Sequence, residues 1–187
     1  MKIRYNSPVV LTFTFICIAA MLLSQLTEGK STSYLFTLYP SFNFSDPFSY
    51  VRIWSHIIGH GSWQHLIGNF SMILLLGPLL EEKYGSGPLL LMMIITAVIT
   101  GILNTFLFST GLLGASGIVF MFILLSSFSG IKEGEVPLTF LMIAIMYFGQ
   151  ELVLSLKEDN ISQFGHILGG LSGSLFGYIS SPSDKMD

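Results

Sequence analysis

The chain has 187 residues, of which 51% are hydrophobic and only 10% are charged, and its mean hydropathy is +0.71. This composition lies outside the range of soluble globular domains and indicates a membrane protein. The net charge of -3 is spread thinly, with no basic block that would indicate a nucleic-acid partner. A single cysteine, Cys17, excludes an internal disulfide and a cysteine-rich metal site.

The apolar segments of the chain predict six membrane spans. Lys2 and Arg4 precede the first one in the manner of a signal peptide, but no small-x-small cleavage site follows, so we interpret it as an uncleaved helix. A span needs roughly 20 mostly apolar residues. The predicted spans are residues 8–26, 61–80, 88–108, 113–128, 136–156 and 161–180. They leave almost no room for a soluble part, so residues 1–187 are predicted to form one all-α polytopic membrane domain.

The longest connection between these spans, residues 27–60, is too polar to cross a bilayer but is rich in Phe, Tyr and Trp. Aromatic residues with polar neighbours prefer the membrane interface. We therefore expect this loop to lie along the bilayer surface and to dip partly into it.

Cationic side chains in the short loops predict the orientation of the chain. One side of the membrane collects Lys2, Arg4, Lys83, Lys132 and Lys185, and the other collects Lys30, Arg52 and Lys157. This bias places both termini in the cytoplasm of a multi-pass protein of the cell membrane. The second, fourth and sixth spans then all run from outside to inside.

Four polar side chains on these three parallel spans fall in one layer of the membrane. At about 1.5 Å per helical residue, Ser116 and His166 lie roughly 24 and 21 Å above the cytoplasmic ends of their spans. His65 and Asn69 lie roughly 24 and 18 Å above the cytoplasmic end of theirs. All four are thus predicted to lie below the outer surface of a hydrocarbon core about 30 Å thick.

Glycines recur every four residues in the last span and favour close packing against its neighbour. They are Gly165, Gly169, Gly173 and Gly177. Such a stripe is equally typical of a simple packing seam, and serine is common at membrane helix contacts. A histidine buried in a span is costly unless it is paired, which makes His166 a candidate functional residue. Together these features favour contact between His166 and Ser116.

A serine and a histidine in contact are typical of acyl-transfer chemistry. Serine needs a base to take its proton, and imidazole is the usual base. The intermediate also needs donors for its oxyanion. His65 and Asn69 stand four residues apart on one helix face and can donate, as can the Ser116 amide near a helix N-terminus. His65 and Asn69 are also typical of hydrogen bonds between helices. His60 falls at the loop edge and is expected to brace the loop.

Glu151 is the only acidic residue within a predicted span. Its position near the outer interface indicates a side chain that faces the interface. No carboxylate stands near Ser116 or His166 in the sequence, so a dyad is predicted rather than a triad.

These residues together resemble the rhomboid family of intramembrane serine proteases, over about residues 52–180. The motifs are Gly114-Ala115-Ser116-Gly117, His60-x4-His65-x3-Asn69, and Gly165-His166 followed by glycines. They occur in order on the matching spans. The serine motif also differs from the nucleophile elbow of soluble hydrolases, which needs glycine where this chain has Ile118.

The resemblance implies a role for each residue. Ser116 would be the nucleophile, His166 the general base, and His65, Asn69 and the Ser116 amide the oxyanion site. His60 would support the start of the second span, and Gly114, Gly117 and Phe120 would support the serine. The implied activity is cleavage of single-span membrane proteins near the outer ends of their helices, within the lipid bilayer and without a cofactor or metal.

The chain departs from the family pattern at two positions. The Trp-Arg pair of the first loop is Val51-Arg52, which weakens the inference about how that loop is anchored. The residue one turn after the serine, commonly tyrosine, is Phe120, which keeps a ring that can stack under His166 but lacks the hydroxyl.

Other functions stay open at this point. All four histidines, His56, His60, His65 and His166, could serve a histidine-ligated metal-binding membrane protein, although no His-Glu-x-x-His zinc motif occurs. A proteolytically inactive relative that binds membrane clients would be expected to lack the serine or the histidine. A transporter is disfavoured because the second half of the chain does not repeat the first.

Overall fold

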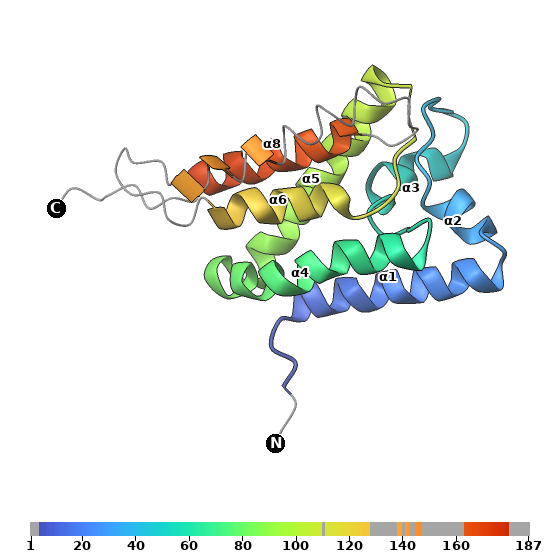
Figure 1. Cartoon of the computed structure of the whole chain (residues 1–187). Coiled ribbons are helices and arrows are strands. Elements are labelled where there is room, and N and C mark those ends of the chain that lie inside the picture. The colour runs from blue at the N-terminus through green and yellow to red at the C-terminus, as the bar shows by residue number, and fades with distance from the viewer. Residues whose placement is uncertain are drawn as a thin grey trace.

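The computed structural model describes residues 4–109, 111–127, 138–139, 141–142, 145–146 and 163–179 (Figure 1). Within these ranges the chain is helical apart from turns, loops and an isolated antiparallel bridge between Leu38 and Leu112. The predicted all-α class agrees with this. The predicted span 136–156 and Glu151 fall mostly outside these ranges, although residues 138–139, 141–142 and 145–146 are helical.

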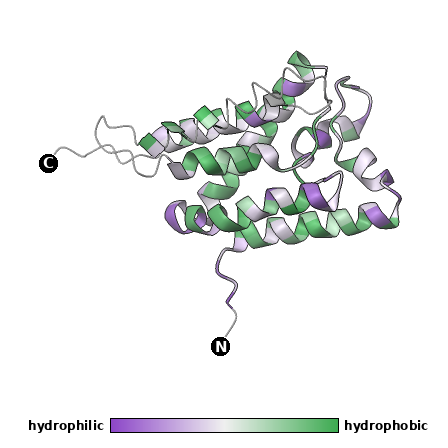
Figure 2. Ribbon diagram, in the orientation of Figure 1, coloured by the Kyte–Doolittle hydropathy of each residue, from purple (hydrophilic) through white to green (hydrophobic). Residues whose placement is uncertain are grey.

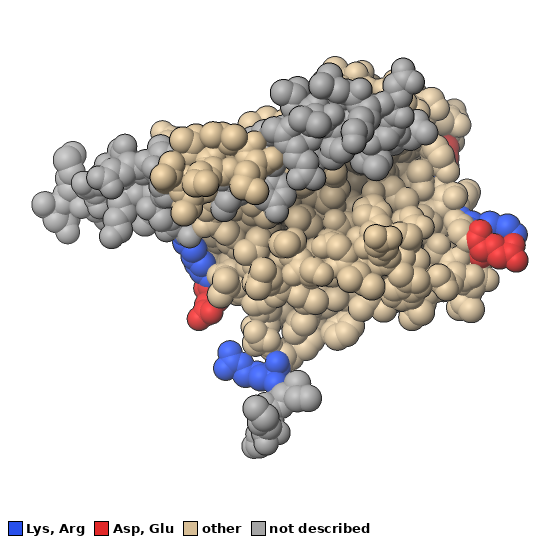
Figure 3. Space-filling model, viewed as in Figure 1, with Lys and Arg blue, Asp and Glu red and all other residues tan. Residues whose placement is uncertain are grey.

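Three helices of the described chain are long and apolar enough to cross a membrane. They are α1 (Pro8–Leu26), α4 (Trp63–Tyr84) and α5 (Ser86–Leu107). Two shorter helices, α6 (Ser116–Ser127) and α8 (Gln163–Ile179), pack side by side over most of their lengths (Figure 1). Among the residues drawn in colour in Figure 3, charged side chains lie toward the ends of this face and none lies in its middle, as expected for a membrane-embedded surface.

Helix α4 extends four residues beyond the predicted end of its span because the first charged residue there is buried. The Glu81 carboxylate accepts hydrogen bonds from the Val9 and Val10 amides, both at 3.0 Å, at the N-terminus of α1. The Ser86 hydroxyl donates to the same carboxylate at 2.7 Å. A carboxylate stabilises a helix N-terminus, so these hydrogen bonds of Glu81 hold the end of α4 against the start of α1.

Helix α6 lies at the centre of the fold and contacts α4, α5 and α8. All of its residues from Ile118 to Leu125 are buried, so it is apolar on every side. A helix of this kind is a core helix. Hydrophobic residues cover α6 in Figure 2, while hydrophilic ones gather at helix ends and in the segment between α1 and α4.

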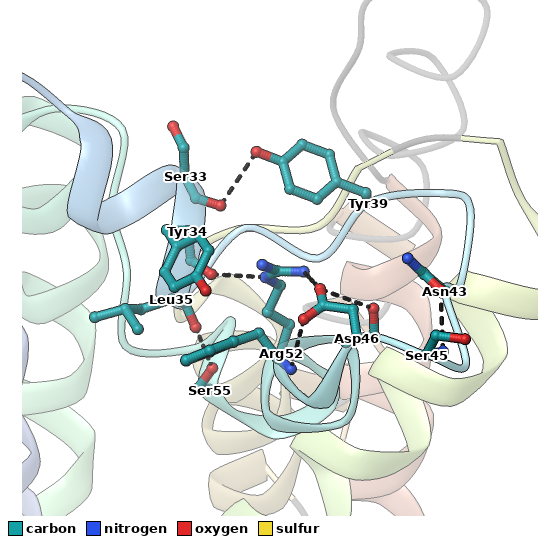
Figure 4. Close-up of polar contacts among 11 residues, drawn as sticks. Ser33, Tyr34, Leu35, Tyr39, Asn43, Ser45, Asp46, Arg52 and Ser55 are labelled. Carbon is teal, nitrogen blue, oxygen red and sulfur yellow. Dashed lines mark hydrogen bonds and ion pairs between the residues drawn. The ribbon is translucent and has the colours of Figure 1, made fainter.

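The segment predicted as a loop over residues 27–60 contains two short helices, α2 (Lys30–Leu35) and α3 (Pro47–Ser55). The Asp46 carboxylate caps α3 by accepting from the Phe48 amide at 3.0 Å. Arg52 is buried between the two helices, where it pairs with Asp46 at 2.9 Å and donates to the Tyr34 carbonyl at 2.8 Å (Figure 4). The segment is therefore folded on itself, with α3 packed on α5.

Candidate active site

The site begins with the close approach of α6 and α8. A Cβ atom built at Gly169 would overlap the backbone carbonyl of Gly117, and one built at Gly173 would overlap the carbonyl of Met121. Only glycine at these positions lets the two backbones touch, as the spacing in the sequence predicts. This contact brings the start of α6 next to the start of α8.

Ser116 and His166 meet at that point. Ser116 is the first residue of α6, and its Oγ lies 2.7 Å from the Nε2 of His166 in the first turn of α8. Both side chains are partly buried. The hydroxyl donates to Nε2 when that nitrogen carries no proton, which is the arrangement needed for a nucleophile and its base.

Phe120 lies one turn after Ser116 and packs against one face of the His166 imidazole. Its ring stacks on that of His166 with centroids 4.7 Å apart and planes only 7° from parallel. The stack fixes the plane of the imidazole by contact between ring faces, which needs no hydroxyl on the phenyl ring.

The chain enters α6 through a tight turn at Gly114, which has a φ of +114° that side chains other than glycine rarely adopt. A Cβ built there would lie 2.6 Å from the His65 imidazole and 3.6 Å from Asn69 Nδ2. The Gly114 amide donates to the His56 carbonyl at 2.9 Å. The turn therefore places the segment leading into Ser116 directly against His65 and Asn69.

The start of α4 sets where His65 and Asn69 point. Ser62 caps the helix by accepting from the His65 amide at 3.1 Å, so α4 begins at Trp63, with His65 in its first turn and Asn69 one turn further on. His65 is partly buried and Asn69 is buried.

The N-terminus of α6 faces His65 and Asn69, and its first intrahelical bond runs from the Val119 amide to the Ala115 carbonyl. The amides before Val119 therefore have no partner within the helix.

His60 contacts residues of the site itself, in addition to the loop that the sequence predicts it to brace. Its side chain is buried, and its Nδ1 lies 3.1 Å from the Ile58 carbonyl. Its Nε2 lies 3.1 Å from Asn69 Nδ2 and 3.4 Å from the Ala115 amide nitrogen. The sequence could not indicate the contact with Ala115, because the two residues are far apart in the chain.

His56 does not turn toward the other histidines. Its Nδ1 lies 3.0 Å from the Ile53 carbonyl and its Nε2 lies 3.5 Å from Thr100 Oγ1. The described part of the chain holds no cluster of three or more His, Cys, Asp or Glu side chains that could bind a metal ion.

A cavity of about 750 Å³ opens elsewhere, between α1, α3 and α5. Its lining is almost entirely apolar and includes Phe13, Trp54 and Met93, but neither Ser116 nor His166. The candidate site is thus defined by its side chains and not by this cavity.

Comparison with known proteins agrees with this geometry. A rhomboid domain model matches residues 47–183, well over half of the chain. The chain belongs to the rhomboid family, which confirms the resemblance found in its motifs. It is 24% identical to the rhomboid protease GlpG of Haemophilus influenzae over 183 residues, covering 95% of this chain and 93% of that protein. It is 28% identical to rhomboid-like protein 15 of Arabidopsis thaliana over 192 residues, covering 93% of this chain and 47% of that protein.

Proposed function

We propose that this protein is an intramembrane serine endopeptidase that hydrolyses peptide bonds of single-span membrane proteins. The observation that carries the proposal is the 2.7 Å contact between Ser116 Oγ and His166 Nε2. Membership of the rhomboid family and the protease named among its relatives support the same activity.

The reaction follows from this pair. Ser116 Oγ attacks the carbonyl carbon of the scissile bond while His166 Nε2 takes the hydroxyl proton. His166 then gives that proton to the leaving amine, and the peptide C–N bond breaks to leave an acyl-enzyme. A water molecule, deprotonated by His166, hydrolyses the ester and restores Ser116.

The negative charge that forms on the substrate carbonyl oxygen needs donors that are already in place. We assign this role to the Ser116 amide, the Asn69 side-chain amide and the His65 ring. The turn at Gly114 supports the assignment, because it lies against both His65 and Asn69. No step of this reaction calls for a metal or a cofactor.

The proposed arrangement in the cell membrane is a single domain of six spans with both termini in the cytoplasm. Arg4 and Lys83 lie near the end of the bundle where α1 starts and α4 finishes. Ser116 lies toward the opposite end, which carries α2 and α3 (Figure 1). These positions support a reaction in the outer half of the bilayer, where the outer ends of substrate helices would reach it.

Cleavage of a membrane reporter tests the proposal. Purified protein in liposomes is expected to cut a single-span reporter, tagged at both ends, in the outer half of its span. Ser116→Ala and His166→Ala are each expected to lower the rate by about 10³-fold or more, because either change removes the nucleophile or its base. Fragment masses and initial rates are the measurements.

Ser127→Ala is the matched control, since it makes the same change in the same helix far from the dyad and removes only a hydrogen bond to the Ile123 carbonyl. It should keep the rate within about twofold, as expected for a substitution away from the reacting groups. Cleavage by Ser116→Ala at the normal rate would contradict the assigned role. A cut in the cytoplasmic half would contradict the orientation, and a folded wild-type protein that never cuts would favour a client-binding relative.

A further inference from the structure

We infer that His60 is a positioning residue of the oxyanion site, which holds the Asn69 side chain and the peptide before Ser116 in place through one ring nitrogen. The inference rests on the proposed protease function and adds to it a residue that touches no substrate. His60 is only 2% exposed, so it acts through the groups that it contacts.

The hydrogen bonds of His60 fix which ring nitrogen carries the proton. Nδ1 faces the Ile58 carbonyl at 3.1 Å, and a carbonyl can only accept, so Nδ1 is the donor. In a neutral ring Nε2 is then an acceptor. The two groups facing Nε2 are the Asn69 amide nitrogen at 3.1 Å and the Ala115 amide at 3.4 Å, which are both donors. One tautomer therefore satisfies every contact.

The same pattern fixes the orientation of the Asn69 side chain. If its amide group were turned over, Oδ1 would face Nε2 and two acceptors would meet. Asn69 must therefore present its nitrogen to His60, where it uses one N–H bond. The second N–H bond stays available to donate to an oxyanion.

His60 also anchors the chain just before the nucleophile. The Ala115 amide bonds to Nε2, and Ala115 is fully buried between the Gly114 turn and the first residue of α6. The proposed donor at the Ser116 amide belongs to the next peptide unit. One imidazole thus contacts one proposed oxyanion donor, Asn69, and the peptide unit next to a second, the Ser116 amide. The value of these donors depends on their being in place before the reaction.

The acceptor role requires a neutral ring. Burial is the main cause that lowers the pKa of His60 to about 4, and the nearby His65 is the second. The ring therefore carries no charge at neutral pH. His65 is the titratable group that faces it, with ring centroids 5.0 Å apart. A charged His60 would turn Nε2 into a donor and break both contacts.

Two substitutions separate this role from simple space filling. The carbonyl of His60→Gln reaches the position of Nε2 and can accept from Asn69 and Ala115, whereas the shorter His60→Asn reaches only the position of Nδ1. His60→Asn is expected to lower kcat about 10²-fold, as loss of an oxyanion donor does, with KM within about twofold. His60→Gln should recover kcat to within about tenfold of wild type.

A double-mutant cycle with Asn69→Ala tests whether His60 acts through Asn69. The kcat loss of the double variant His60→Asn/Asn69→Ala should be clearly smaller than the product of the two single losses. Thermal unfolding in detergent checks that each variant is folded. If His60→Asn does not fold, the cycle is run with His60→Gln, whose remaining loss should shrink in the Asn69→Ala background. Gln64→Ala, at an exposed position in the first turn of α4, is the control and should keep kcat within about twofold of wild type.

The possible failures are distinguishable. If Ser116→Ala cleaves normally, the proposed function fails. If Ser116→Ala is inactive but His60→Asn keeps kcat within about threefold, the function stands and the positioning role is wrong. Equal losses for His60→Gln and His60→Asn, or fully multiplicative losses with Asn69→Ala, also overturn the positioning role.

Discussion

The histidines of this protein differ in the hydrogen-bond partners of their ring nitrogens. His166 presents Nε2 to a serine hydroxyl at 2.7 Å, which suits it to exchange a proton. His60 and His56 each direct Nδ1 at backbone carbonyls, which holds that nitrogen in the protonated form. The same side chain is therefore suited to proton transfer in one place and to holding backbone segments in another.

Acidification should destabilise the fold through His56 and His60. Burial lowers the pKa of each from 6.5 to about 4, so between these values the unfolded chain binds more protons than the folded one. The contribution of each ring to the free energy of unfolding is therefore complete above pH 6.5. It falls toward pH 4 by roughly 1.4 kcal/mol per pH unit for each ring. Thermal unfolding midpoints of the purified protein between pH 7.5 and 4.5 measure this.

His60→Gln removes one of the two titrating rings and serves as the control. The decline of its midpoint between pH 6.5 and 5 should be about half that of wild type. A midpoint independent of pH over that range would show that neither ring stays neutral in the folded protein. An identical decline in the variant would show that His60 does not contribute to it.

At the scale of elements, the interface between α6 and α8 decides whether Ser116 and His166 come into contact. Both residues are at the starts of these helices, and the contacts of Gly117 and Gly169 fix how close the helices come. A side chain at that contact has no room because its neighbour is backbone, which cannot rotate away as a flexible side chain can. The geometry of the site is therefore a consequence of helix packing.

Gly169→Val is expected to separate α8 from α6 and to lower cleavage at least tenfold, together with a lower unfolding midpoint, because its Cβ overlaps the Gly117 carbonyl. Gly68→Ala is the matched control, since a Cβ there meets open space. Replacing a helical glycine by alanine should keep the rate and raise stability by about 0.5–1 kcal/mol. Normal cleavage by Gly169→Val would show that the packing does not control the site.

Sequence patterns predict the elements where the signal is local and repeated. Apolar runs predict α1 and α5, and the glycines spaced four apart predict the close contact of α8. The two helices within residues 27–60 were not predicted, although Asp46-Pro47 is a recognisable cap followed by a favoured first residue. The extension of α4 past the predicted span is likewise not encoded locally, because burial of Glu81 depends on a partner on α1 that is distant in sequence.

The contacts within the site could be predicted only in part. The spacing of Ser116 and Phe120 places both on the face that meets His166, which is where the stacked ring lies. The three contacts of His60 depend on the path of the chain through the Gly114 turn, and no sequence period encodes that path. The oxyanion donors are accordingly a proposal that rests on neighbouring positions and on the hydrogen bonds of one histidine.

At the scale of the whole molecule, the surroundings of α6 bear on how a polar reaction fits in a membrane. The described part of α6 packs against α4, α5 and α8. Helices α4 and α5, with 22 residues each, are long and apolar enough to cross a membrane. Ser116 at the start of α6 is therefore flanked by protein, which can hold polar groups away from lipid.

The central claim is that Ser116 is a nucleophile made reactive by His166. The most direct measurement is labelling by a fluorophosphonate probe in liposomes, with the modified residue located by mass spectrometry. We predict that the label falls on Ser116, is absent in Ser116→Ala, and forms at least about 10²-fold more slowly in His166→Ala. A label on another residue, or an equal rate without His166, would contradict the account.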